Sequence, residues 1–145
     1  MPRTSSSARR YAEAAFQLAV ASDDVATWRG QLDAAADVLS DPRLERILVN
    51  PALAAASREE VAREALGHRV GPGAWNLVRL LIHRGRVELL PRIATEFHRL
   101  DDRRAGISTA TATSAEPLDD AEQRALIQRL EAITGGEVRL TTAVD

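Results

Sequence analysis

Apolar residues in the first segment of the chain cover more of a helix than one buried face requires. Residues 5–21 are rich in strong helix formers. At roughly 100° per residue their apolar side chains span about 240°, whereas a core-facing stripe needs only about 100°. The polar wedge holds Arg9, Arg10, Glu13 and Gln17. We expect one face to pack into the core and another to be free for a partner; the alternative is a central helix buried on all sides by its own chain.

A second helix with excess apolar surface is predicted at residues 74–84. Its apolar positions cover roughly 220°, so that Asn76, Arg79 and His83 form the solvent-facing edge. The preceding segment, residues 67–73, contains three glycines and a proline and is expected to be a loop. Two helices of the chain therefore have apolar surface beyond what a single core-facing stripe uses.

Four further helices are predicted, and two of them, residues 25–39 and 87–104, carry the narrow stripe typical of one buried face. A short helix is expected to start at Ser40-Asp41-Pro42, because proline in the first turn loses no hydrogen bond. Another is expected to open on a capping box formed by Ser57 and Glu60. The side chains expected to face inward on that helix are Val61, Ala65 and Leu66.

The apolar period changes from 3.6 to 2 at Gly106. Residues 107–114 and 138–144 alternate as strands, and a helix between them starts at the cap-like pair Asp119 and Glu122. Strands joined in this way are parallel if they pair directly. Since a two-stranded sheet alone is marginally stable, we expect this module to be incomplete, with the rest in a missing segment or on another chain.

The predicted fold is mainly α: a six-helix bundle in residues 1–105, followed by a small, incomplete α/β module of strand, helix and strand in residues 106–145. At 145 residues, the chain is long enough for one ordinary domain or two small ones.

Charge and composition exclude several classes of function. All basic residues are arginine, and residues 1–104 have a net charge of +2 against −4 for residues 105–145, so neither part has the concentrated positive charge of a nucleic-acid-binding face. Cysteine is absent, which excludes thiolate catalysis and thiolate metal sites. No apolar run reaches the roughly 18 residues of a membrane span, and the polar start lacks a secretory signal. We expect a soluble, intracellular protein without direct membrane insertion.

Residues capable of acid–base or metal chemistry do not form a recognisable site. His68, His83 and His98 lie at spacings of fifteen, so none has a second histidine three or four positions away to build a metal face, and His83 and His98 are expected to be solvated side chains at helix edges. Of the adjacent acidic pairs, three are expected to act at helix ends and one, Asp101-Asp102, to be a solvated face. No catalytic residue, metal site or cofactor is therefore predicted.

Four sequence blocks, in order along nearly the whole chain, resemble the delta subunit family of bacterial F-type ATP synthases, the counterpart of the mitochondrial oligomycin sensitivity-conferring protein. They are ARRYAEAAF at residues 8–16, NLVRLLIHRGRVELLP at residues 76–91, TSAEPL at residues 113–118 and VRLTTAVD at residues 138–145. Each block is moderately specific alone, and their shared order carries the resemblance.

The resemblance implies a non-catalytic stator subunit of the peripheral stalk, at the cytoplasmic face of the cell membrane as part of the complex. In this family the six-helix domain holds an N-terminal segment of an alpha subunit in a groove between helices one and five, and the C-terminal module joins the b subunits. The residues that match the family's groove are Tyr11, Ala14 and Leu80. The same apolar arcs add Leu18 and Leu77 as candidate partner-binding residues.

The chain departs from the family in its C-terminal module. The family continues past the closing Val-Asp with a Gly-Gly hairpin and another helix, and it usually has basic residues where Gly135-Gly136-Glu137 stand here. A competing interpretation is a stand-alone helical RNA-binding or regulatory adaptor domain, which the near-neutral charge of the N-terminal region disfavours.

Overall fold

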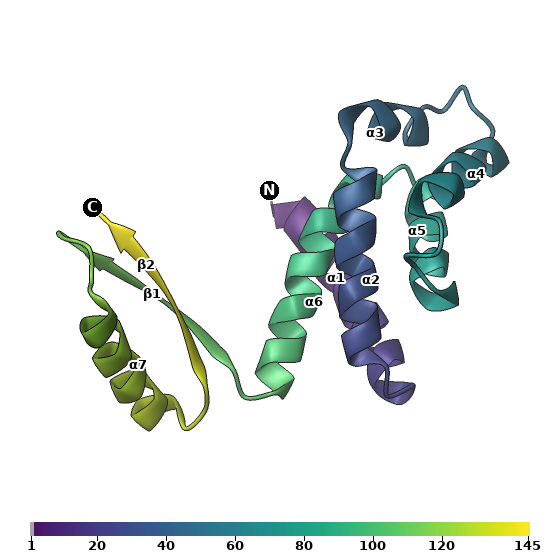
Figure 1. Ribbon diagram of the computed structural model, residues 1–145. Coiled ribbons are helices and arrows are strands. Elements are labelled where there is room, and N and C mark those ends of the chain that lie inside the picture. The colour runs from purple at the N-terminus through teal and green to yellow at the C-terminus, as the bar shows by residue number, and fades with distance from the viewer. Residues whose placement is uncertain (1) are drawn as a thin grey trace. The chain divides into compact units, whose positions relative to one another are not determined.

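The computed structural model describes residues 2–145, with side chains from Ser6 onward, and it is mainly helical with one small parallel sheet, which confirms the predicted fold class (Figure 1). The chain divides into two compact units, Met1–Leu100 and Asp101–Asp145, and each is described by itself. The functional assignment of residues 1–105 and 106–145 as domains stays a prediction.

The N-terminal unit is built from short helices joined by tight turns. In chain order its elements are α1 (Pro2–Ala21), α2 (Val25–Leu39), α3 (Pro42–Leu48), α4 (Ala55–Leu66), α5 (Pro72–His83), the 3₁₀ turn η1 (Val87–Leu89) and α6 (Leu90–Arg104), whose last turn belongs to the second unit. In Figure 1, α1, α2 and α6 lie together, and α3 leads across to α4 and α5.

Local chemistry explains several of these helix ends. The side chain of Asp41 accepts a hydrogen bond of 2.9 Å from the amide of Arg43, and Pro42 occupies the first turn of α3 as predicted. The predicted capping box is wrong, because α4 begins at Ala55 and Ser57 is already helical. Alanine is the strongest helix former, and Ala55 and Ala56 extend the helix beyond the point where the side-chain signal placed its start, with Ala54 as the N-cap.

The core of the N-terminal unit is centred on the ring of Phe97, which is fully buried. Phe16 approaches it edge to face at 5.4 Å between ring centroids, and Trp28 stacks on it at 6.4 Å. Of the residues expected to face inward on α4, Leu66 is buried and Val61 half-buried, but Ala65 is exposed and Ala62 is buried instead. The buried face of α4 is therefore rotated about the helix axis relative to the predicted face.

The C-terminal unit contains β1 (Ser108–Ser114), α7 (Asp120–Thr134) and β2 (Val138–Val144). The strands pair in parallel, with Ser108 opposite Val138, as the strand–helix–strand order predicts. Asp119 and Glu122 form a complete capping box. Asp102, expected to be solvated, instead accepts hydrogen bonds of 3.2 Å from Arg139.

Apolar cover over this small sheet is thin. Val138 is the buried hydrophobic residue of the unit, α7 has no buried residue, and the side chain of Ile133 is 80% exposed. Such a unit leaves apolar helix surface in contact with solvent.

Candidate partner-binding groove

A groove of about 750 Å³ lies between α1 and the C-terminal end of α5. Its floor is apolar and its rim is basic. The residues that line it are Ser7, Arg10, Tyr11, Ala14, Leu80, Arg84 and Arg86.

The structure brings together three of the five predicted partner-binding residues, because Tyr11, Ala14 and Leu80 all line this groove. Leu18 and Leu77 do not line it. Leu18 is 60% exposed on α1, one turn beyond Ala14, whereas Leu77 is half-buried and packs against the core cluster. Leu18 therefore extends the exposed apolar side of α1, and the surroundings of Leu77 are those of a core residue.

The wide apolar arc of α1 divides into a buried side and an exposed side. Its core-facing line consists of small side chains, all essentially buried: Ala8, Ala12, Ala15 and Ala19. Alanines bring the helix backbone close to its neighbours, and the larger residue Leu18 is left outside with Ala14. Helix α1 is thus not buried on all sides by its own chain.

Helix α5 shows the same division. Ala74, Val78, Leu81 and Ile82 are buried, while Leu80 is 40% exposed and forms part of the groove floor. A single solvent-exposed leucine at a helix end is common in proteins and does not by itself indicate a binding site. Together with Tyr11 and Ala14 of α1, it forms the apolar part of the groove lining.

Sequence reasoning missed the basic rim. Arg84 and Arg86 stand on either side of Gly85, whose positive φ of 63° turns the chain sharply after α5. Arg86 reaches back to α1, where its Nη1 donates a hydrogen bond of 3.0 Å to Oγ of Ser7. The Arg-Gly-Arg triplet at a helix end was the available signal, but nothing in the sequence indicated that it faces the start of the chain.

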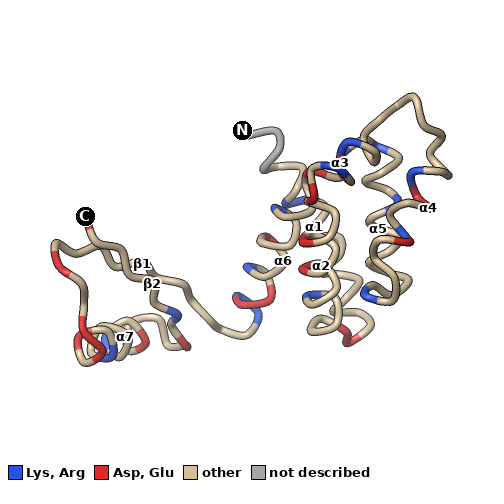
Figure 2. Tube along the Cα trace, turned by 45° about the horizontal axis from the view of Figure 1, so that its top comes forward, with Lys and Arg blue, Asp and Glu red and all other residues tan. Residues whose placement is uncertain are grey.

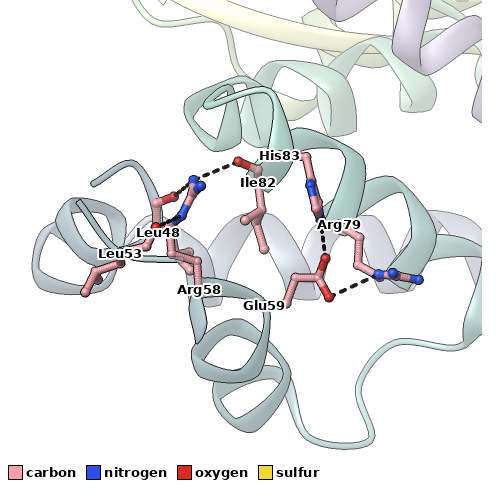
Figure 3. A network of polar contacts seen from close by, with 7 residues as sticks. All are labelled: Leu48, Leu53, Arg58, Glu59, Arg79, Ile82 and His83. Carbon is pink, nitrogen blue, oxygen red and sulfur yellow. Dashed lines mark hydrogen bonds and ion pairs between the residues drawn. The ribbon is translucent and has the colours of Figure 1, made fainter. Parts of the chain in front are cut away.

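Backbone carbonyls at the end of α5 and around the α3–α4 connection are tied together by one guanidinium group (Figure 3). Arg58 donates hydrogen bonds to the carbonyl oxygens of Leu48 at 3.2 Å, Ile82 at 3.0 Å and Leu53 at 3.3 Å. Carbonyls near helix ends lack intrahelical partners, so a cationic donor there satisfies several of them at once. The contact fixes the end of α5 that carries Leu80 and Arg84.

A second polar contact holds α5 against α4 (Figure 3). Glu59 accepts a hydrogen bond from the His83 side chain and forms an ion pair with Arg79, with 3.3 Å between Nε and Oε2. The His83 hydrogen bond is the main reason that the pKa of Glu59 lies below its ordinary value; burial opposes this shift, and the positive charge of Arg79 adds to it. His83 is exposed at the helix edge, as expected from the sequence, and it also has a carboxylate partner that the sequence did not indicate.

Two smaller hollows lie elsewhere on the N-terminal unit. One of about 190 Å³ has Trp75 in its wall, with the guanidinium carbon of Arg63 5.0 Å from the ring centroid. The other, of about 430 Å³, contains His98, whose Nε2 lies 2.7 Å from Oδ1 of Asp33. The His98 side chain is partly exposed, and it too has a carboxylate partner that the sequence did not indicate.

Catalytic or metal-binding groupings do not emerge from the described residues. No cluster of three or more histidine and acidic side chains suitable for a metal ion occurs among residues 2–145. In the same part of the chain, no helix has the length and apolar character needed to cross a membrane.

Acidic and basic positions are interspersed along the helices (Figure 2). The groove between α1 and α5 is therefore the strongest candidate site.

Comparison with known proteins gives one consistent family. The profile of the family described as OSCP, ATP synthase delta (OSCP) subunit, matches residues 8–145. ATP synthase subunit delta of Methylobacillus flagellatus is 36% identical over 138 residues, covering 95% of this chain and 78% of that protein. The subunit delta of Nitrosospira multiformis is 32% identical over 145 residues, covering 100% and 82%.

A solved structure supports the fold independently. The chain is similar to one in the cryo-EM structure of the Toxoplasma gondii mitochondrial ATP synthase hexamer, with a TM-score of 0.60 and 23% sequence identity. The similarity covers 95% of this chain and 78% of that chain. At this identity the match supports the arrangement of helices and strands alone.

Proposed function

The chain belongs to the ATP synthase delta (OSCP) subunit family, and on this premise we propose that it is a non-catalytic stator subunit of an F-type ATP synthase. In this role it ties the catalytic alpha/beta head to the b-subunit stalk, so that torque from the central shaft drives nucleotide chemistry in the head. It acts at the cytoplasmic face of the membrane, held there by the complex and not by insertion of its own helices.

The N-terminal unit holds an amphipathic N-terminal segment of an alpha subunit in the groove between α1 and α5. The observation that carries this proposal is the convergence of Tyr11, Ala14 and Leu80, from two separate helices, on one apolar floor. A helix laid into such a groove is anchored by side chains three or four positions apart. Leu18 continues the floor along α1 for a longer bound helix.

A mechanical tether needs slow dissociation and no chemistry. Burial of a helical segment along an apolar groove provides this, because its dissociation exposes all of the buried apolar surface at once. The polar contacts of Arg58 and Glu59 hold α5 against α4, so the groove is preformed and loses little conformational entropy on binding.

The C-terminal unit is proposed to contact the b subunits. Its exposed Ile133 and the absence of buried residues on α7 leave apolar surface for a further partner. An Ile133→Asp variant is expected to lose co-purification with the b subunits while still binding the alpha segment, and unchanged co-purification would contradict this assignment.

The groove is tested by calorimetric titration of the full chain with a synthetic peptide of the alpha subunit's N-terminal segment. We expect saturable one-to-one binding that is weakened at least tenfold by Leu80→Asp or Ala14→Asp, because a charge placed on an apolar floor is desolvated without a partner. Ile47→Asp is the matched control, since Ile47 is 39% exposed outside the groove and Leu80 is 40% exposed within it. Absence of saturable binding by the unaltered chain would refute the groove.

A further inference from the structure

We propose that the three arginines at the rim of the groove select a partner segment whose apolar stripe is flanked by carboxylates. This inference rests on the proposed function and names the chemistry of the segment that the groove takes. Arg10, Arg84 and Arg86 line the groove, and none of its lining residues with a described side chain is acidic. The rim is therefore a positively charged surface beside an apolar floor.

The three rim arginines are among the arginines of the described chain that form no ion pair with an acidic residue. Arg79, Arg99 and Arg139 each pair with a carboxylate of the same unit, at 3.3, 2.9 and 3.2 Å. Within the described part of the chain, no carboxylate forms an ion pair with any of the three rim arginines. Their positive charge is thus available to a carboxylate supplied by another molecule.

The rim is held in place before a partner arrives. The turn after α5 is fixed by hydrogen bonds from the amide of Arg84 to the carbonyl of Leu80 at 3.1 Å and from the amide of Arg86 to that of Leu81 at 2.8 Å. The side chain of Arg86 is also held by Ser7, an uncharged acceptor that leaves its charge unneutralised. Less side-chain entropy remains to be lost when Arg86 binds an anion.

The occupant that this surface fits is an acidic amphipathic helix. A basic segment would place like charges beside Arg10 and Arg84. A nucleic acid would pair its phosphates with the rim, but it would leave Leu80 and Ala14 against a polar backbone. An alpha-subunit segment with Asp or Glu on both sides of its apolar stripe satisfies the rim and the floor together.

The test measures association and dissociation of the alpha-subunit N-terminal peptide with the full chain between 50 and 500 mM salt. The test protein carries Gln at positions 10, 84 and 86 in place of arginine (R10Q, R84Q, R86Q). A matched control carries R43Q, R46Q and R69Q, which remove the same charge from exposed arginines outside the groove. A second peptide has every Asp and Glu replaced by Asn and Gln, which requires no change in the protein.

We expect the rim variant to bind about tenfold more weakly at low salt, chiefly through slower association, and the control to bind as the unaltered chain does. Raising the salt should weaken binding of the unaltered chain and have little effect on the rim variant. The neutral peptide should reproduce the rim variant's affinity on the unaltered chain.

The inference is overturned if the rim variant and its control bind alike, if the neutral peptide binds as well as the acidic one, or if the alpha segment carries no carboxylates. Binding that persists in those cases, with Leu80→Asp still disruptive, would leave the proposed tethering function standing. Tighter binding of single-stranded RNA than of the peptide would overturn both, as would no binding of the peptide.

Discussion

Arg58 on α4 donates a hydrogen bond of 3.0 Å to the carbonyl oxygen of Ile82, one of the last carbonyls of α5. The same guanidinium reaches Leu48 and Leu53, so one side chain links the end of α5 to the α3–α4 connection (Figure 3). Because Leu80 and Arg84 lie on either side of Ile82 in the chain, this contact sets the position of the groove wall without touching the groove.

Replacing Arg58 with alanine is expected to lower the free energy of unfolding of the N-terminal unit by about 2–3 kcal/mol, because three carbonyls lose a charged donor together. Urea unfolding followed by tryptophan fluorescence measures it, since Trp28 and Trp75 both lie in that unit. Arg43→Ala, at an exposed site, should change the value by less than about 0.5 kcal/mol. Equal effects of the two substitutions would contradict the role of Arg58.

The contact between Glu59 and α5 predicts a pH dependence of stability. The pKa of Glu59 is lowered in the folded chain, first by the His83 hydrogen bond and then by Arg79, so its ionised form stabilises the fold above its ordinary pKa of 4.5. This stabilisation is lost as the pH falls below that value through the folded pKa. The difference in unfolding free energy between the unaltered chain and Glu59→Gln should therefore be present at pH 6 and disappear in acid. A difference that does not change with pH would contradict this.

Helical periodicity predicted most of the fold, because the spacing of apolar residues along each helix indicates which of its faces is buried. The arcs of residues 5–21 and 74–84 predicted two helices with apolar surface to spare, and Leu18 and Leu80 are indeed exposed. The parallel strand pair followed equally from the alternating segments around a capped helix.

Contacts between residues that are far apart in the sequence could not be predicted from periodicity. Arg86 meets Ser7 across 79 positions, and Glu59 meets His83 across 24, and no local pattern records such pairs. The capping box predicted at Ser57 was wrong for a local reason. The helix propensity of the preceding alanines starts α4 at Ala55, before the serine. The apolar floor of the groove was therefore predictable, whereas its basic rim and polar supports were not.

Two glycines of the N-terminal unit should respond to alanine in opposite directions. A Cβ at Gly73 would lie 2.5 Å from Cζ2 of Trp28, whose side chain is buried, so Gly73→Ala should destabilise the unit by about 1–3 kcal/mol. Gly30 lies inside α2 with nothing within 4 Å of its added Cβ. Gly30→Ala should stabilise the unit by about 0.5–1 kcal/mol, as expected of an exposed helix position. Thermal unfolding of both variants provides the measurement, and a shift of the same sign in both would contradict the packing of α5 on Trp28.

In the C-terminal unit, Gly136→Ala should disrupt the parallel strand pair. A Cβ there would lie 2.2 Å from the carbonyl oxygen of Gly106, a backbone atom that cannot rotate away. The nearby hydrogen bond of 2.8 Å from the amide of Ser108 to the carbonyl of Glu137 begins the strand register, and it would be displaced with the backbone. Amide hydrogen exchange along β1 and β2 should therefore become faster in this variant. Thr111→Val, on an exposed position of β1, keeps a β-branched side chain and should leave exchange nearly unchanged. Slow exchange retained in Gly136→Ala would show that the two chain segments approach each other less closely than this structure has them.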